Sequence, residues 1–99
     1  MFGRKKEPRA SVEARHGFVS GRVQSVAFRF YTRQEAVQLR LKGWVRNLED
    51  GRVEFHVQGS PERVEEFMRW VAGGPPLARV TSVEAATCDP EALEAFDIL

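Results

Sequence analysis

The sequence predicts an α+β domain in which two helices cover one face of a mostly antiparallel sheet. Along the 99 residues, apolar side chains change from strand-like alternation to helical spacing and back, and they do so twice. Glycine, proline and Asx residues separate the segments at the points where turns are needed. A chain of this length has room for one hydrophobic core, so both halves are expected to share it.

The first half is expected to form a strand, a helix and a second strand. Residues 11–20 are rich in β-compatible residues and end at a Ser-Gly break. Over residues 25–42 the apolar positions recur at helical spacing, and Gly43 is expected to end the helix. The aromatic cluster of this helix (Phe28, Phe30 and Tyr31) is expected to pack in the core. Residues 44–47 follow as a short strand.

The second half is expected to repeat this order. Asp50-Gly51 is a hairpin signal, and residues 52–58 alternate cleanly between apolar and polar side chains. Ser60-Pro61 suits a helix start, because serine is a good N-cap and proline fits the first helical position. Strands are expected at residues 79–87 and 95–98. The order β-α-β-β-α-β with a short C-terminal strand is that of a ferredoxin-like sandwich.

Charge and composition restrict the partners. The first nine residues carry four basic side chains and one acidic one, a charge of +3, so residues 10–99 carry −2. We expect residues 1–9 to be a disordered basic tail and residues 10–99 to be a single domain. A folded body of this charge disfavours a nucleic-acid partner. No apolar run approaches the roughly 20 residues of a membrane span, so no membrane partner is expected.

The cysteine and the two histidines are expected to be structural. Cys88 stands alone, which fits a reducing, cytoplasmic location, and it is expected to be a half-buried strand side chain without a nearby histidine. His16 is expected to face solvent or a side-chain partner. His56 is expected on the solvent face of its strand with Glu54 and Gln58, where RNA-binding sheets carry aromatic residues instead. These residues are too scattered to predict a metal site or a cofactor.

The stretch Gly21–Arg29 is the strongest candidate for chemistry. It follows a predicted strand and opens a predicted helix, where backbone N–H groups can converge on an anion. Arg29 can add a permanent charge and a two-pronged contact. An ordinary β-to-α turn with Arg29 as a surface charge is the alternative, and Asn47 can be read as a turn-initiating residue. The candidate backbone donors are Arg22, Val23, Gln24, Ser25, Val26 and Ala27.

A family resemblance connects these elements. Residues 20–32 resemble the signature loop of the acylphosphatases, and residues 43–47, Gly-Trp-Val-Arg-Asn, resemble their second signature. Further similar stretches are residues 50–54, 58–59 and 74–80, in register from about Ala10 to Ile98. The family has the ferredoxin-like fold.

The resemblance implies hydrolysis of acyl phosphates to a carboxylate and inorganic phosphate, without a metal, by a protein expected to be a monomer. By position, Arg29 matches the phosphate-binding arginine and Asn47 the asparagine that orients water. Ser25 and Ala27 stand where glycine is common in the family. A left-handed conformation at Ser25 would cost about 1–2 kcal/mol. The alternative is therefore a phosphate-binding or regulatory module with impaired turnover.

Overall fold

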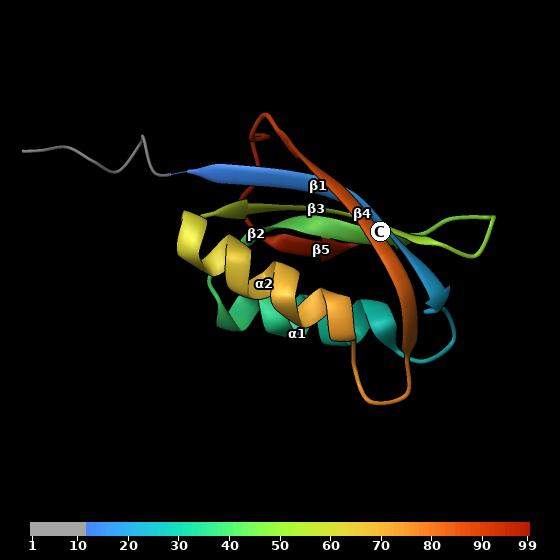
Figure 1. Ribbon diagram of the computed structural model, residues 1–99. Helices are drawn as coiled ribbons and strands as arrows, with labels where there is room; N and C mark the ends of the chain where they lie inside the picture. The colour runs from blue at the N-terminus through green and yellow to red at the C-terminus, as the bar shows by residue number, and fades with distance from the viewer. Residues whose placement is uncertain (1–11) are drawn as a thin grey trace, which may run out of the picture.

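The computed structural model describes residues 12–99, which form a five-stranded sheet with two helices against one face (Figure 1). In chain order the elements are β1 (Glu13–Arg22), α1 (Phe28–Gln38), β2 (Lys42–Asn47), β3 (Val53–Gly59), α2 (Pro61–Gly73), β4 (Arg79–Cys88) and β5 (Phe96–Ile98). The predicted element order and the ferredoxin-like arrangement are confirmed. The tail predicted at residues 1–9 lies outside the described residues.

The strands lie side by side in the order β4-β1-β3-β2-β5. All neighbours pair antiparallel except β2 and β5, which run parallel. The core fills the space between this sheet and the helices, and it is built mainly from valine and phenylalanine, which suit pleated surfaces. Its fully buried side chains include Val19, Val45, Val53, Phe55 and Val57 from the sheet and Phe28, Val64, Phe67 and Val71 from the helical side.

Helix α1 is shorter than predicted at both ends. It begins at Phe28 because residues 25–27 form a loop, and it ends before Arg40, which adopts a left-handed φ of 59°. The prediction that Gly43 ends this helix was wrong. Gly43 lies in β2, where a Cβ atom would come within 1.9 Å of the carbonyl oxygen of His56 on β3. Glycine is needed there for the close approach of two strands.

A β-bulge directs the end of β1 towards the first loop. The pairing of β1 with β4 shifts register between Ser20 and Gly21, so that Thr81 of β4 has no partner on β1. Gly21 has a φ of 123°, and a Cβ atom there would lie 2.1 Å from the carbonyl oxygen of Arg79. Bulges bend a strand and increase its twist. This bend turns the chain into the loop that precedes α1.

Two predictions about exposure were wrong. Phe30 and Tyr31 are exposed, whereas only Phe28 of the aromatic cluster is buried. His56 is 1% exposed instead of facing solvent, and its neighbours Glu54 and Gln58 are buried too. For His56 and Gln58 the cause is the segment between β4 and β5, which crosses one end of the face that the helices leave open and whose Glu91 backbone N–H donates to Gln58 Oε1 at 2.8 Å. Glu54 is covered instead by its side-chain partners His16 and Arg46.

No helix within residues 12–99 has the length and apolar character needed to cross a bilayer.

Candidate active site

The loop between β1 and α1 is anchored by its apolar residues and exposes its small ones. Val23, Val26 and Phe28 are buried in the core, while Ser25 and Ala27 are exposed. This alternation fixes the loop over the end of the sheet without any glycine between residues 22 and 27. Ser25 and Ala27 are therefore held at the surface at a defined position.

Ser25 and Ala27 both adopt left-handed conformations, with φ of 63° and 58°. Ala27 is also the N-cap of α1 and makes no side-chain capping bond. Each left-handed residue with a Cβ costs about 1–2 kcal/mol. Such strain concentrates at functional sites, and left-handed residues within a turn aim successive N–H groups into an anion-binding concavity.

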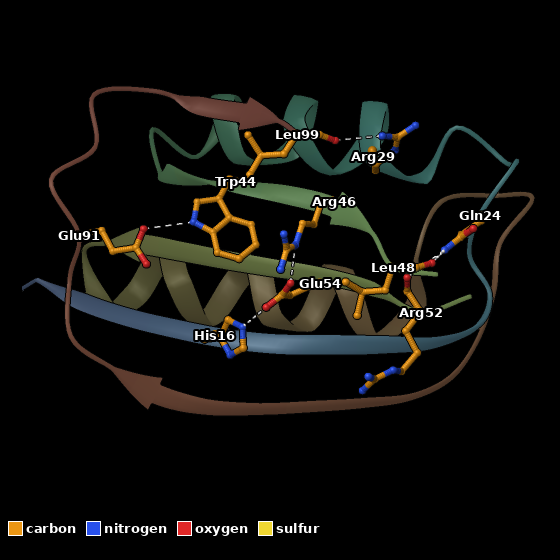
Figure 2. A network of polar contacts seen from close by, with 10 residues as sticks. All are labelled: His16, Gln24, Arg29, Trp44, Arg46, Leu48, Arg52, Glu54, Glu91 and Leu99. Atoms are coloured by element: carbon orange, nitrogen blue, oxygen red, sulfur yellow. Dashed lines mark hydrogen bonds and ion pairs between the residues drawn. The ribbon is translucent and has the colours of Figure 1, made fainter. Parts of the chain in front are cut away.

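The side chain of Gln24 ties the loop to the turn between β2 and β3. Its Nε2 atom donates to the carbonyl oxygens of Leu48 at 2.9 Å and Arg52 at 3.0 Å, as Figure 2 shows. Leu48 directly follows Asn47, so this contact fixes the loop relative to the asparagine. The sequence-based prediction for Gln24 included only its backbone N–H group. The sequence did contain one sign of a side-chain role: Gln24 is a polar residue between Val23 and Val26, the two valines that anchor the loop.

Arg29 lies in the first turn of α1 and is half-buried. Its Nη1 atom donates to the main-chain oxygen of Leu99 at 3.2 Å, beyond the end of β5 (Figure 2). No Asp or Glu side chain within residues 12–99 forms an ion pair with it. A guanidinium has five N–H donors, so most of them stay available for an anion.

Asn47 is the last residue of β2 and pairs with Val53 of β3. Its side-chain Oδ1 atom is buried and has no hydrogen-bond partner in the part of the chain that the structure describes. An unsatisfied buried polar atom costs about 1–3 kcal/mol. The amide thus retains hydrogen-bonding capacity at the position where it meets the loop.

A cavity of about 200 Å³ brings the loop, Arg29 and Asn47 together. Its lining consists of Val23, Gln24, Ser25, Ala27, Phe28, Arg29, Phe30, Asn47 and Ile98. Two of the predicted donors lie outside this lining. Arg22 ends β1 in register with Arg79, and Val26 is buried in the core.

The cysteine lies at the other end of β1, in register with Ala14. The expectation that no histidine is near it was wrong, because Cys88 Sγ lies 3.7 Å from His56 Nδ1. Burial, followed by the nearby Glu91 and Asp89, raises the pKa of the Cys88 thiol above its ordinary value. The thiol is therefore protonated at neutral pH. Within residues 12–99, no three His, Cys, Asp or Glu side chains are grouped to hold a metal ion.

Known proteins share both the sequence and the fold. The acylphosphatase family model matches residues 15–98. An acylphosphatase of Thermococcus kodakarensis is 51% identical over 84 residues, covering 85% of this chain and 92% of that protein. The structure of an acylphosphatase from Coxiella burnetii superposes with a TM-score of 0.91 at 33% identity, covering 96% of this chain and 100% of that one. One from Bacillus subtilis superposes with a TM-score of 0.85 at 34% identity, covering 88% and 98%. The chain belongs to the acylphosphatase family.

Proposed function

We propose that the cavity between the β1–α1 loop and the end of β2 is the active site, where Arg29 binds the phosphoryl group and Asn47 orients the attacking water. The activity, hydrolysis of acyl phosphates to a carboxylate and inorganic phosphate, follows from family membership. The observation that carries the assignment of residues is the shared lining of one cavity by Arg29, Asn47 and the strained loop.

Phosphate binding is assigned to the loop backbone together with Arg29. The N–H groups of residues 22–27 are the proposed donors, and those of Ser25 and Ala27 have the best support because both residues line the cavity in left-handed conformations. Arg29 would exchange its bond to the Leu99 main-chain oxygen for contacts with phosphoryl oxygens. Charge-assisted bonds of this kind are about twice as strong as neutral ones.

The reaction needs few groups from the protein. The water oxygen forms a bond to phosphorus while the bond from phosphorus to the acyl oxygen breaks, and the carboxylate leaves. A carboxylate is a weak base, so its departure requires no general acid, and a phosphoryl oxygen of the substrate can accept the proton of the water. Catalysis then consists of positioning and of stabilising the phosphoryl charge. This chemistry calls for no cofactor.

The amide of Asn47 suits the positioning role. Its Oδ1 atom has no partner within residues 12–99 and can accept a hydrogen bond from water, while its N–H groups can donate. An amide has no charge, so it orients water without competing with Arg29 for the phosphate. Effective positioning of a reactant contributes several kcal/mol to catalysis.

Substitution of the two residues tests the assignment. Arg29→Ala and Asn47→Ala are expected to lower kcat/KM for benzoyl phosphate by about 10²–10³-fold or more, with unchanged circular dichroism. Arg63→Ala is the matched control, since Arg63 is an exposed arginine in the first turn of α2, lies outside the cavity and makes no side-chain hydrogen bond or ion pair within residues 12–99. Full turnover in either active-site variant would contradict its role. Phosphate binding by the wild-type protein without hydrolysis would favour the impaired phosphate-binding module.

The same proposal extends to the setting of the protein. We propose that residues 10–99 act as a single monomeric domain in the cytoplasm, on small acyl phosphates and not on nucleic acid. Inorganic phosphate, as the product, is expected to inhibit competitively. Analytical ultracentrifugation and phosphate inhibition kinetics test the monomer and the anion site, respectively.

A further inference from the structure

The lining of the active-site cavity includes exposed apolar side chains. Besides Arg29 and Asn47, the lining includes Phe30 and Ile98, which come from α1 and β5. Phe30 is 55% exposed and Ile98 is 42% exposed, so both side chains form the rim and not the base of the cavity. Phe30 directly follows Arg29, which places an aromatic ring beside the proposed phosphate-binding group.

Exposed apolar side chains gather on these two elements. Of the seven large apolar residues that are exposed among residues 12–99, four belong to the first turn of α1 or to the end of the chain after Phe96. They are Phe30, Tyr31, Ile98 and Leu99. Single exposed apolar residues are normal on protein surfaces, but two members of this group, Phe30 and Ile98, also line the cavity, which is typical of ligand sites.

Contacts within the protein hold Ile98 and Phe30 in place at the rim of the cavity. Ile98 is fixed by the parallel pairing of β5 with Val45 of β2. Leu99 extends this pairing with a backbone N–H bond to the Val45 carbonyl oxygen at 2.9 Å, and its own main-chain oxygen accepts from Arg29. On the opposite element, the ring of Phe30 meets that of Tyr31 edge-on, with centroids 5.4 Å apart.

The size of the cavity decides which part of a substrate meets these residues. At about 200 Å³ it is smaller than the roughly 300–1,000 Å³ of sites that enclose drug-sized ligands. It can enclose a phosphoryl group and the adjoining carbonyl, which Arg29, the loop and Asn47 would hold. The remainder of the acyl group must extend past the rim, where Phe30 and Ile98 stand.

We infer that Phe30 and Ile98 form the acyl subsite and make the protein favour acyl phosphates with an aromatic or bulky apolar acyl group over those with a small one. The inference rests on the proposed function, because it assumes that the phosphoryl group occupies the loop. Phe30 and Ile98 are specificity residues and not catalytic ones: they contact the acyl group and none of the reacting atoms. An aromatic acyl group gains contact with the Phe30 ring, whereas an acetyl group barely reaches it.

The test compares two substrates across rim variants. For Phe30→Ala, kcat/KM for benzoyl phosphate is expected to fall about three- to tenfold, mainly through KM, while kcat/KM for acetyl phosphate stays within about twofold. Ile98→Ala is expected to act in the same direction, and Phe30→Tyr to retain the preference. Val37→Ala is the matched control, because Val37 is a similarly exposed apolar residue of α1 outside this cavity.

The outcomes separate the two proposals. If the wild-type protein hydrolyses neither substrate, the proposed function fails. If it hydrolyses both and Phe30→Ala and Ile98→Ala leave their ratio unchanged, the proposed function stands and the acyl subsite is refuted. An equal loss for both substrates in a folded variant, as judged by thermal unfolding, would make Phe30 a structural residue and would also refute the subsite.

Discussion

The cavity at the end of β1 and the polar network on the open face of the sheet use their polar groups in opposite ways. In the network, the two carboxylate oxygens of Glu54 lie 2.6 Å from His16 Nε2 and from Arg46 Nε (Figure 2). In the cavity, Asn47 Oδ1 has no partner within residues 12–99, and Ser25 and Ala27 are strained. One region satisfies its polar groups, and the other keeps them available.

The network also accounts for the buried histidine. His56 Nε2 lies 2.7 Å from Gln58 Oε1, and the ring stacks on Trp44. The indole N–H of Trp44 donates to Glu91 at 3.1 Å, and Gln58 Nε2 donates to the Glu91 carbonyl oxygen at 2.9 Å. These contacts fasten the segment between β4 and β5 to the sheet. The network thus pairs its polar groups, whereas the cavity keeps two left-handed residues and an unpaired amide oxygen, a combination that is typical of functional sites.

After Arg29 and Asn47, the largest effect is expected at Gln24, whose side chain ties the loop of the cavity to the turn after β2. Gln24→Ala removes both hydrogen bonds to the turn after β2, so the loop is no longer fixed relative to Asn47. Because misplacement of a catalytic group by about 1 Å can lower the rate about 100-fold, kcat/KM for benzoyl phosphate is expected to fall about 10–100-fold. The measurement is steady-state kinetics on the folded variant.

Gln34→Ala provides the control for Gln24→Ala. Gln34 lies on α1, is exposed and makes no side-chain hydrogen bond to the described residues. Its variant should keep wild-type kinetics. Equal activity in the Gln24 and Gln34 variants would show that the anchored valines alone position the loop.

The next effect is on stability and leaves activity intact. Glu54→Gln keeps the size of the side chain but removes the charge that His16 and Arg46 contact, and the free energy of unfolding is expected to fall by about 1–2 kcal/mol. Urea unfolding measures the change. Glu84→Gln is the control, because Glu84 is an exposed residue of β4 in register with Phe18 and has no ion pair within residues 12–99. A loss of turnover in Glu54→Gln would mean that the two regions are coupled.

The contribution of Glu54 is expected to depend on pH in one direction. Burial opposes ionisation of this carboxyl, but hydrogen bonds from His16 and Arg46 outweigh it and hold the pKa of Glu54 below its ordinary value of 4.5. The unfolded chain therefore takes up the proton more readily than the folded protein. The stability difference between wild type and Glu54→Gln should therefore shrink as the pH falls below 4.5. A difference that grows in acid would contradict this assignment.

The helix-covered face was predictable and the open face was not. Alternation over residues 52–58 correctly predicts β3 and its apolar side, but it does not say what covers the other side. The cover is a segment without periodicity, held by contacts such as Gln58 to Glu91, which are 33 residues apart. Spacing did contain one unused signal: on a helix, Phe30 lies about 200° from Phe28, so both could not face the core.

The candidate site was predictable only in part for a similar reason. The resemblance points to Arg29 and Asn47, and one cavity contains both. The side-chain bonds of Gln24 join backbone carbonyls 24 and 28 residues away, and no local pattern encodes such a contact. The exposed rim of Phe30 and Ile98 depends on the parallel pairing of β5 with β2, which sequence spacing does not determine.

The smallest expected effect tests whether the loop of the cavity is strained at all. Ser25→Gly and Ala27→Gly each relieve about 1–2 kcal/mol of left-handed strain in the folded protein. Glycine also increases the entropy of the unfolded chain, which offsets about 0.5–1 kcal/mol of this gain. Each substitution should therefore raise the free energy of unfolding by about 0.5–1 kcal/mol. Ala72→Gly on the exposed side of α2 is the control and should lower the free energy of unfolding by about 1 kcal/mol, since its helical conformation carries no such strain.

Opposite signs for the loop and helix variants would confirm stored strain in the loop, whereas equal losses would show that Ser25 and Ala27 are held without strain. If Ser25→Gly gains stability but loses turnover, the Ser25 hydroxyl itself contacts the phosphoryl group.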